Sequence, residues 1–300
     1  MNLKKILSLA LAGITLITMP LAFASCSSFA ETEYAIIGEG LTFDNFIYDQ
    51  YENSTVKITG VENMPAHLII PDQINGMTVV EIAEEAFAGN DMLIYLELPK
   101  GNIKLGRGFC SGSVALIAVN LSGSVSVIPE LAFENCSNLA LIDGVSGITS
   151  IESQAFAGCY SLASIKFPET LTSIGNEAFR GCTAITSINI PAAVTFIGES
   201  AFWGCSGLTA IELNCTADIP SYCFLDCNTL TSVKIGDGVT AVKEEAFRNC
   251  RMLYSVEIGK SCKNIEDYAF HACDSLTDVS FADSKDIVIG EGNESLGAVN

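Results

Sequence analysis

Histidine, tryptophan and positive charge are all scarce in this sequence. Its 300 residues include two histidines and one tryptophan, and 15 lysines or arginines stand against 35 aspartates or glutamates. The formal net charge of −20 at pH 7 disfavours nucleic acids and anionic membrane surfaces as partners, because both would repel the chain. The simplest explanation of this charge is a solubilising surface on an elongated protein.

Short motifs for metal and cofactor binding are also absent. The sequence contains no Cys-x-x-Cys pair of the kind that binds zinc, no Gly-x-Gly-x-x-Gly and no phosphate-binding loop with lysine. We therefore expect no metal and no cofactor.

The N-terminus resembles a secretion signal. Two lysines precede the apolar run Ile6–Met19, which is too short to span a bilayer comfortably. Loss of these lysines with the signal leaves 13 basic and 35 acidic residues, a formal charge of −22. The segment predicts a mature protein outside the cytoplasm.

Two cleavage sites compete at the end of this segment. Ala22-Phe23-Ala24 before Ser25 has the small residues that ordinary signal peptidase requires. Phe23-Ala24-Ser25-Cys26 instead resembles a bacterial lipobox, with phenylalanine where leucine is usual, and would place a diacylglycerol on Cys26. We favour a lipid-anchored cell-surface protein, with a secreted protein as the alternative.

A repeat of 22 to 24 residues organises the rest of the chain. Its clearest copy is Ile174–Pro191, and its marker is a phenylalanine that most copies place directly after alanine. A unit this short cannot bury its apolar face alone, so nine copies predict a solenoid in which each coil packs on its neighbours. The marker residues are Phe87, Phe109, Phe133, Phe156, Phe179, Phe202, Phe224, Phe247 and Phe270.

Apolar residues occupy fixed positions relative to each marker. The residues six, nine and eleven after it spell Leu-x-x-Ile-x-Ile, as in Leu208, Ile211 and Leu213, which is the strand motif of a leucine-rich repeat. Carboxylates lie two or three residues before it, as Glu177 does, and we interpret them as the first turn of a short helix. The predicted fold is a right-handed α/β solenoid of about nine coils, with short parallel strands and short helical turns.

The domain order follows from where the repeat begins and ends. An array needs a cap over its first apolar cross-section, and the segment before the repeat is the candidate. We expect a signal peptide at 1–25, a linker and N-terminal cap at 26–63, the solenoid at 64–282, and an end strand or tail at 283–300.

Units such as Ile174–Pro191, together with the lipobox-like Cys26, resemble the BspA-like leucine-rich repeat family over roughly residues 56–282. The Ala-Phe-x-x-Cys signature is the specific part of the match. The resemblance implies a bacterial surface or secreted protein. In some members the array binds host matrix proteins such as fibronectin or fibrinogen, so the resemblance implies a host matrix or cell-surface protein as the partner.

Seven of the twelve cysteines form a column three residues after the marker. Neighbouring coils lie roughly 4.8 Å apart, but parallel side-chain directions are poor for bridging, so we predict a buried structural ladder rather than disulfides. Four cysteines lie off the column, and an occasional disulfide among these four is an alternative in an extracytoplasmic setting. The column comprises Cys136, Cys159, Cys182, Cys205, Cys227, Cys250 and Cys273; the others are Cys110, Cys215, Cys223 and Cys262.

Catalysis is not expected. His67 and His271 are about nine coils apart, roughly 40 Å at strand spacing, and so cannot share a site. A dyad of His271 with Cys273 would need a column cysteine to leave the core. The glutamate pairs recur with the repeat, whereas catalytic carboxylates are usually placed once. We assign no catalytic residue.

Two surfaces remain for binding. The outward strand positions are polar and have few of the aromatic anchors that tight interfaces use. The position just after the marker reads Arg180, Trp203, Leu225, Arg248 and His271 in consecutive coils, and we call these five residues the Arg-Trp stripe. We predict a non-catalytic protein-binding module, adhesive or receptor-like, and expect the stripe to contact a protein or an acidic glycan. The alternative is an acidic spacer of the envelope without a dedicated ligand.

Overall fold

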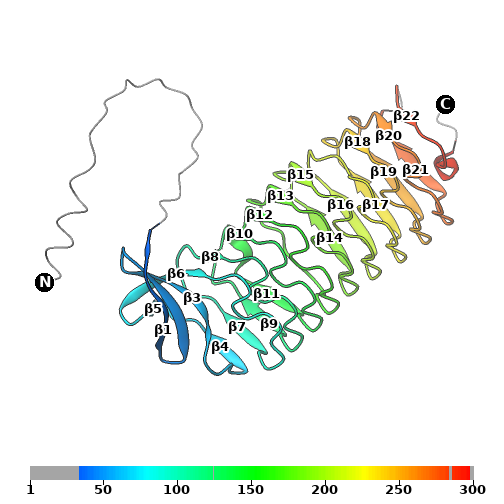
Figure 1. Cartoon of the computed structure of the whole chain (residues 1–300). Coiled ribbons are helices and arrows are strands. Elements are labelled where there is room, and N and C mark those ends of the chain that lie inside the picture. The colour runs from blue at the N-terminus through cyan, green and yellow to red at the C-terminus, as the bar shows by residue number, and fades with distance from the viewer. Residues whose placement is uncertain (1–33, 124, 284–285, 298–300) are drawn as a thin grey trace, which may run out of the picture. The chain divides into compact units, whose positions relative to one another are not determined.

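The computed structural model describes residues 34–123, 125–283 and 286–297, which form stacked coils that follow a small antiparallel segment (Figure 1). In this segment β1 (Ile36–Phe43) pairs with β2 (Phe46–Tyr51), and β2 pairs with β3 (Thr55–Val61). Strand β3 then pairs in parallel with β6 (Met77–Ile82), which itself pairs antiparallel with β5 (Gln73–Ile74). The segment therefore joins the first coil through a continuous sheet.

Each coil contributes short parallel strands to two ladders. The first ladder holds the residues about five before each marker: β6 with β8 (Lys104–Leu105); β10 (Val127–Ile128), β12 (Ser150–Ile151), β13 (Ser173–Ile174) and β15 (Phe196–Ile197); and β18 (Ala241–Val242), β20 (Asn264–Ile265) and β22 (Val288–Ile289). These rungs form three sheets.

The second ladder follows the Leu-x-x-Ile-x-Ile motif and forms two sheets. The N-terminal strand sheet contains β4 (His67–Ile69), β7 (Tyr95–Glu97), β9 (Ala118–Asn120) and β11 (Leu141–Asp143). The C-terminal strand sheet contains β14 (Ser187–Ile190), β16 (Ala210–Leu213), β17 (Ser232–Ile235), β19 (Ser255–Ile258) and β21 (Asp278–Phe281). The coil between them forms no strand at 163–168. The predicted leucine-rich-repeat solenoid is confirmed.

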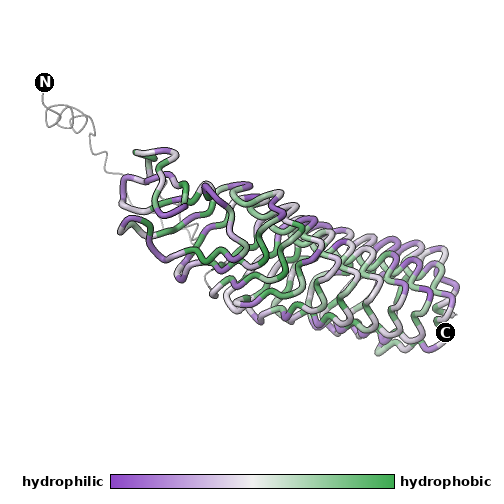
Figure 2. Tube along the Cα trace, turned by 90° about the horizontal axis from the view of Figure 1, so that it is seen from below, coloured by the Kyte–Doolittle hydropathy of each residue, from purple (hydrophilic) through white to green (hydrophobic). Residues whose placement is uncertain are grey.

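Phenylalanine stacks along the inside of the coils. From Phe133 to Phe270 the ring centroids of successive coils are 5.1 to 5.4 Å apart and the ring planes lie within 14° of parallel. All nine marker residues are buried. Hydrophilic stretches recur at the same places in successive coils, so the polar surface repeats with the core (Figure 2).

The segments around each marker are turns, and the predicted α/β class with helical turns is wrong. Within the described residues the helices are two single 3₁₀ turns, Val145–Gly147 and Glu294–Leu296. Residues two before and two after the marker have a left-handed backbone, as at Glu177 (φ 54°) and Gly181 (φ 74°), which a right-handed helix cannot include. Their N–H groups bond to the next coil instead, as Gly181 N–H does to the carbonyl of Trp203 at 2.7 Å.

The second coil is shifted by one residue from its expected alignment. Cys110, not Phe109, occupies the marker position, because its N–H donates to the carbonyl of Ala132 at 3.1 Å as the other markers do to the following coil. The left-handed residues Gly108 and Gly112 flank it at two residues on either side. The spacings from Phe87 to Cys110 and from Cys110 to Phe133 are both 23 residues. Phe109 takes the place of the usual alanine and remains buried.

The side chain of Asn293 closes the last coil. It is 5% exposed, and its Oδ1 accepts the N–H of Phe270 at 2.8 Å, where a following coil would supply a carbonyl. Its Nδ2 donates to the carbonyls of Glu266 and Gly290 at 2.8 and 3.0 Å. The amide oxygen thus accepts the N–H bond that a carbonyl of the following coil accepts in the earlier coils.

Truncation of one stacked ring should destabilise the array. Phe202→Ala removes a fully buried side chain between two stacked rings, which costs about 3–5 kcal/mol of unfolding free energy. Urea denaturation followed by the fluorescence of Trp203 measures this loss. The control is Phe196→Ala in the same coil, whose ring is 52% exposed and whose loss should change the midpoint little. Equal losses in the two variants would contradict the role of the stack.

Candidate functional site

The Arg-Trp stripe lies on the turns that follow the stacked phenylalanines, in five consecutive coils. Each of its residues stands between a buried phenylalanine and a left-handed residue, a position at which the chain turns outward. Arg180 is exposed, and the other four are half-buried. The repeat thus holds five side chains at successive rungs along one edge.

Arg180 and Trp203 form the centre of the stripe. The guanidinium carbon of Arg180 lies 4.9 Å from the centroid of the Trp203 ring, a cation–π contact between neighbouring coils. Arg180 also pairs with Glu177 at 3.1 Å. The indole Nε1 donates to Oδ2 of Asp226 at 3.2 Å, and Asp226 accepts Nδ2 of Asn249 at 2.9 Å through its other oxygen. Both side chains are therefore held in place before any partner arrives.

Arg248 is neutralised in the same way. Its Nη1 lies 2.7 Å from Oε2 of Glu245, and this hydrogen bond raises the pKa of the Arg248 guanidinium. Its Nε is buried and has no hydrogen-bond partner within the described residues. His271 meets the ring of Tyr268 edge-on, with centroids 5.5 Å apart. Sequence reasoning identified the arginines but missed their carboxylates, although the i,i+3 spacing of both pairs was visible.

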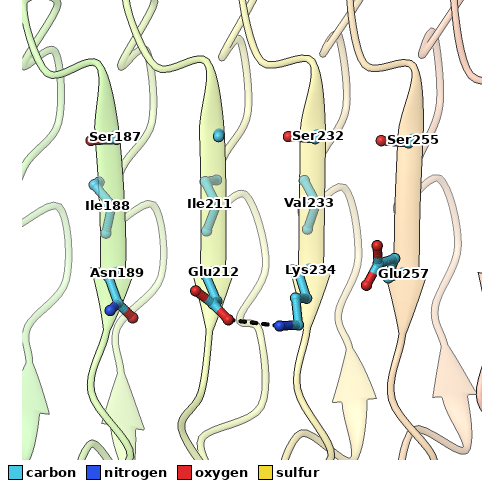
Figure 3. A pocket seen from close by; sticks show the side chains of 11 residues that line it. Ser187, Ile188, Asn189, Ile211, Glu212, Ser232, Val233, Lys234, Ser255 and Glu257 are labelled. Atoms are coloured by element: carbon cyan, nitrogen blue, oxygen red, sulfur yellow. Dashed lines mark hydrogen bonds and ion pairs between the residues drawn. The ribbon is translucent and has the colours of Figure 1, made fainter.

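The C-terminal strand sheet presents the second candidate surface. A shallow hollow of about 470 Å³ crosses β14, β16, β17 and β19 (Figure 3). Figure 3 shows Glu212 and Lys234 side by side on adjacent strands, and their ion pair measures 2.8 Å. The hydrogen bond from Lys234 lowers the pKa of Glu212. Both side chains are largely exposed, so the pair adds little stability, and the hollow offers no aromatic anchor.

The column cysteines are buried thiols that donate hydrogen bonds to the preceding coil. Sγ of Cys205 lies 3.2 Å from the carbonyl of Phe179, and Sγ of Cys182 lies 3.2 Å from that of Phe156. In the shifted second coil Ser113 takes the cysteine position. All eleven described cysteines, including the four off the column, are buried and free.

The two histidines lie in different coils, and no metal-binding group forms within the described residues. His67 contacts Tyr95 in the first coils, whereas His271 lies in the last. Cys273 is committed to the core, where Sγ donates to the carbonyl of Phe247 at 3.2 Å. Across 34–123, 125–283 and 286–297, no three histidine, cysteine or acidic side chains are grouped to hold a metal ion.

The predicted signal and Cys26 lie outside the described residues. A search of those that are described found no helix both long and apolar enough to cross a membrane.

Comparisons with known proteins match the repeat. The family described as "BspA type Leucine rich repeat region" matches residues 69–159 and 149–277, in six copies. A leucine-rich cell surface protein from Faecalibacterium prausnitzii is 21% identical, with 82% of this chain and 95% of that chain covered and a TM-score of 0.52. A leucine-rich repeat protein from T. pallidum is 27% identical, with 80% and 92% covered and a TM-score of 0.50. No curated protein matches the chain.

Alkaline pH should weaken the fold through the thiols. Burial raises the pKa of Cys136, Cys205 and Cys273 to about 12, from an ordinary value of 9.0. Between these values the unfolded chain binds fewer protons than the native chain, so the free energy of unfolding falls as pH rises from about 9 to 12. Urea midpoints measured from pH 8 to 11 test this.

The Cys205→Ala variant is the control for other titrating groups. It loses packing equally at every pH, but its midpoint should fall less steeply above pH 9 than that of the parent chain, because one fewer thiol titrates. Parallel curves for the two chains would contradict the assignment.

Proposed function

The chain belongs to the BspA-type leucine-rich repeat family, and from that premise we propose that it is a non-catalytic, extracytoplasmic module that binds another protein. We place the contact on the Arg-Trp stripe. The observation that carries the proposal is Arg180 stacked on Trp203, with Glu177 and Asp226 fixing the two side chains.

Preorganisation supports this surface. Arginine and tryptophan are the side chains that most often dominate binding energy at protein interfaces. A long side chain that is already ordered loses less conformational entropy when a partner docks. The repeat supplies this order, because the backbone of each turn is already fixed by hydrogen bonds to the next coil.

The electrostatics favour a protein over an acidic glycan. Arg180 and Arg248 each face a carboxylate within 3.1 Å, so little positive charge is left for sulfate or uronate groups. What the stripe offers is flat guanidinium and indole surface with polar edges. Such surfaces suit the mixed side chains of a protein.

The membrane attachment is a separate part of the proposal. We propose that Cys26 carries a lipid, with secretion after ordinary cleavage as the alternative. The mass of the mature protein from the native host distinguishes them: a chain that begins at Cys26 with an added diacylglycerol supports the anchor, and one that begins at Ser25 without it contradicts the anchor. The Cys26→Ser variant should abolish the lipid mass and release the protein from membranes.

A structural spacer is the second candidate function. The formal charge of −22 on the mature chain and the paired charges on the C-terminal strand sheet favour a solvated surface without a ligand. The two functions differ in whether the stripe matters to any interaction.

A triple substitution tests the stripe. The mature chain, residues 27–300, is assayed on immobilised fibronectin, fibrinogen and surface extract of the producing cell. Arg180→Ala, Trp203→Ala and Arg248→Ala together should weaken saturable binding at least about tenfold, because hot-spot truncations cost about 2 kcal/mol or more.

The matched control removes two paired cations and one exposed aromatic elsewhere. Arg107→Ala, Lys234→Ala and Phe196→Ala change the charge and aromatic content equally, and all three side chains are exposed. This control should bind like the parent chain. Equal binding by both triple variants would place the contact elsewhere, and no saturable binding to any probe would favour the spacer.

A further inference from the structure

Four exposed apolar side chains lie on or directly beside the strands of the N-terminal strand sheet. Ile69, Ile94, Ile117 and Leu141 are 61%, 38%, 48% and 50% exposed. Ile69 and Leu141 belong to β4 and β11, and the other two directly precede β7 and β9. We call these four residues the apolar face.

The four residues lie on consecutive rungs. Ile117 N–H donates to the carbonyl of Ile94 at 2.8 Å, and Leu141 N–H donates to that of Ile117 at 3.2 Å. Strand β4, which carries Ile69, pairs in parallel with β7. Adjacent rungs are about 4.8 Å apart, so Ile94, Ile117 and Leu141 form one continuous patch. Ile69 lies opposite Glu97, three residues further along the strand from Ile94, and borders this patch.

The fold does not require apolar residues at these positions. In the later coils the equivalents of Ile94 and Ile117 are Thr186, Thr209, Thr231, Tyr254 and Thr277, and those of Leu141 are Ser187, Ala210, Ser232, Ser255 and Asp278. These coils stack in the same register and build regular strands. A clustered apolar surface that packing does not demand indicates a contact.

Unpaired carboxylates border the apolar face. Glu97 and Asp143 stand at outward positions of β7 and β11. No ion pair among the described residues involves either of them, whereas Glu212 at the equivalent position of the C-terminal strand sheet is paired with Lys234. The hydroxyl of Tyr95 donates a hydrogen bond to Glu97 at 2.7 Å.

We propose that the apolar face binds a segment of another protein that carries apolar side chains together with lysine or arginine. Its apolar side chains cover the isoleucines and Leu141, and its cations meet Glu97 and Asp143. A second copy of this chain fits poorly, because self-pairing would bring the same carboxylates together on a strongly acidic molecule. This surface lies on different coils from the Arg-Trp stripe and does not depend on the function proposed for it.

Three synthetic ten-residue peptides serve as probes: alternating Leu-Lys, Ser-Lys and Leu-Glu. Binding to the mature chain, residues 27–300, is measured by fluorescence anisotropy. The Leu-Lys peptide should bind, and the other two should bind at least about tenfold more weakly, because each lacks one of the two features. Equal binding of the Leu-Lys and Ser-Lys peptides would overturn the proposal, since charge alone would then explain it.

The key variant is Ile94→Thr, Ile117→Thr and Leu141→Ser, which installs the residues that the later coils carry at these positions. It should stay folded and lose at least about tenfold in affinity for the Leu-Lys peptide. The control is Tyr254→Thr, which removes a 56% exposed ring directly before β19 and should leave the affinity unchanged. Unchanged affinity in the triple variant would overturn the proposal.

A charge variant and two further assays separate the alternatives. Glu97→Gln with Asp143→Asn should weaken the Leu-Lys peptide and flatten its salt dependence. Sedimentation that shows self-association abolished by the triple variant would assign the face to a second copy and overturn the proposal. Binding to phosphatidylcholine vesicles abolished by the triple variant would assign it to a lipid surface and overturn it too. The variant with alanine at Arg180, Trp203 and Arg248 should retain peptide binding. Failure of the stripe proposal can therefore be distinguished from failure of this one.

Discussion

Hydrogen bonds between the backbones of successive coils hold the array in register, as when the Phe179 N–H donates to the carbonyl of Ala201 at 2.8 Å. Such bonds form only when equivalent residues of neighbouring coils lie side by side, and this requires coils of nearly equal length. Once the register is set, each position becomes a column along the molecule. The stacked rings, the buried thiols and the Arg-Trp stripe are columns of this kind, and the apolar face combines residues from neighbouring columns.

The columns explain which parts of the fold were predictable. Spacing alone identified the solenoid, the strand motif and the buried residues, because a repeat period can be recognised in a sequence without knowledge of the local backbone geometry. The turns were mispredicted because Glu177 and Glu245 are good helix formers that nevertheless adopt left-handed backbone conformations. Hydrogen bonds to the next coil override this intrinsic preference. The second coil was misaligned because a phenylalanine stands beside the true marker position, Cys110.

The surfaces were harder to predict than the core. The composition of the stripe was visible in the sequence, but its electrostatics were not, because they depend on rotamers that pair Arg180 with Glu177 and stack it on Trp203. The apolar face was missed for a different reason. An isoleucine beside a strand motif resembles a core residue, and only the fold shows that Ile94 and Ile117 point to solvent.

The bonds between coils also have a direction along the chain. A column thiol such as Cys205 donates to the preceding coil, whereas the marker N–H groups donate to the following one. If the chain emerges and folds from its N-terminal end, each new thiol finds its acceptor already in place, and each new coil satisfies the donors left open by the last. At every stage only the leading edge has unmet N–H groups. The array is in this sense a polymer with unlike ends, and in the last described coil the side chain of Asn293 accepts the N–H of Phe270 that would otherwise stay open.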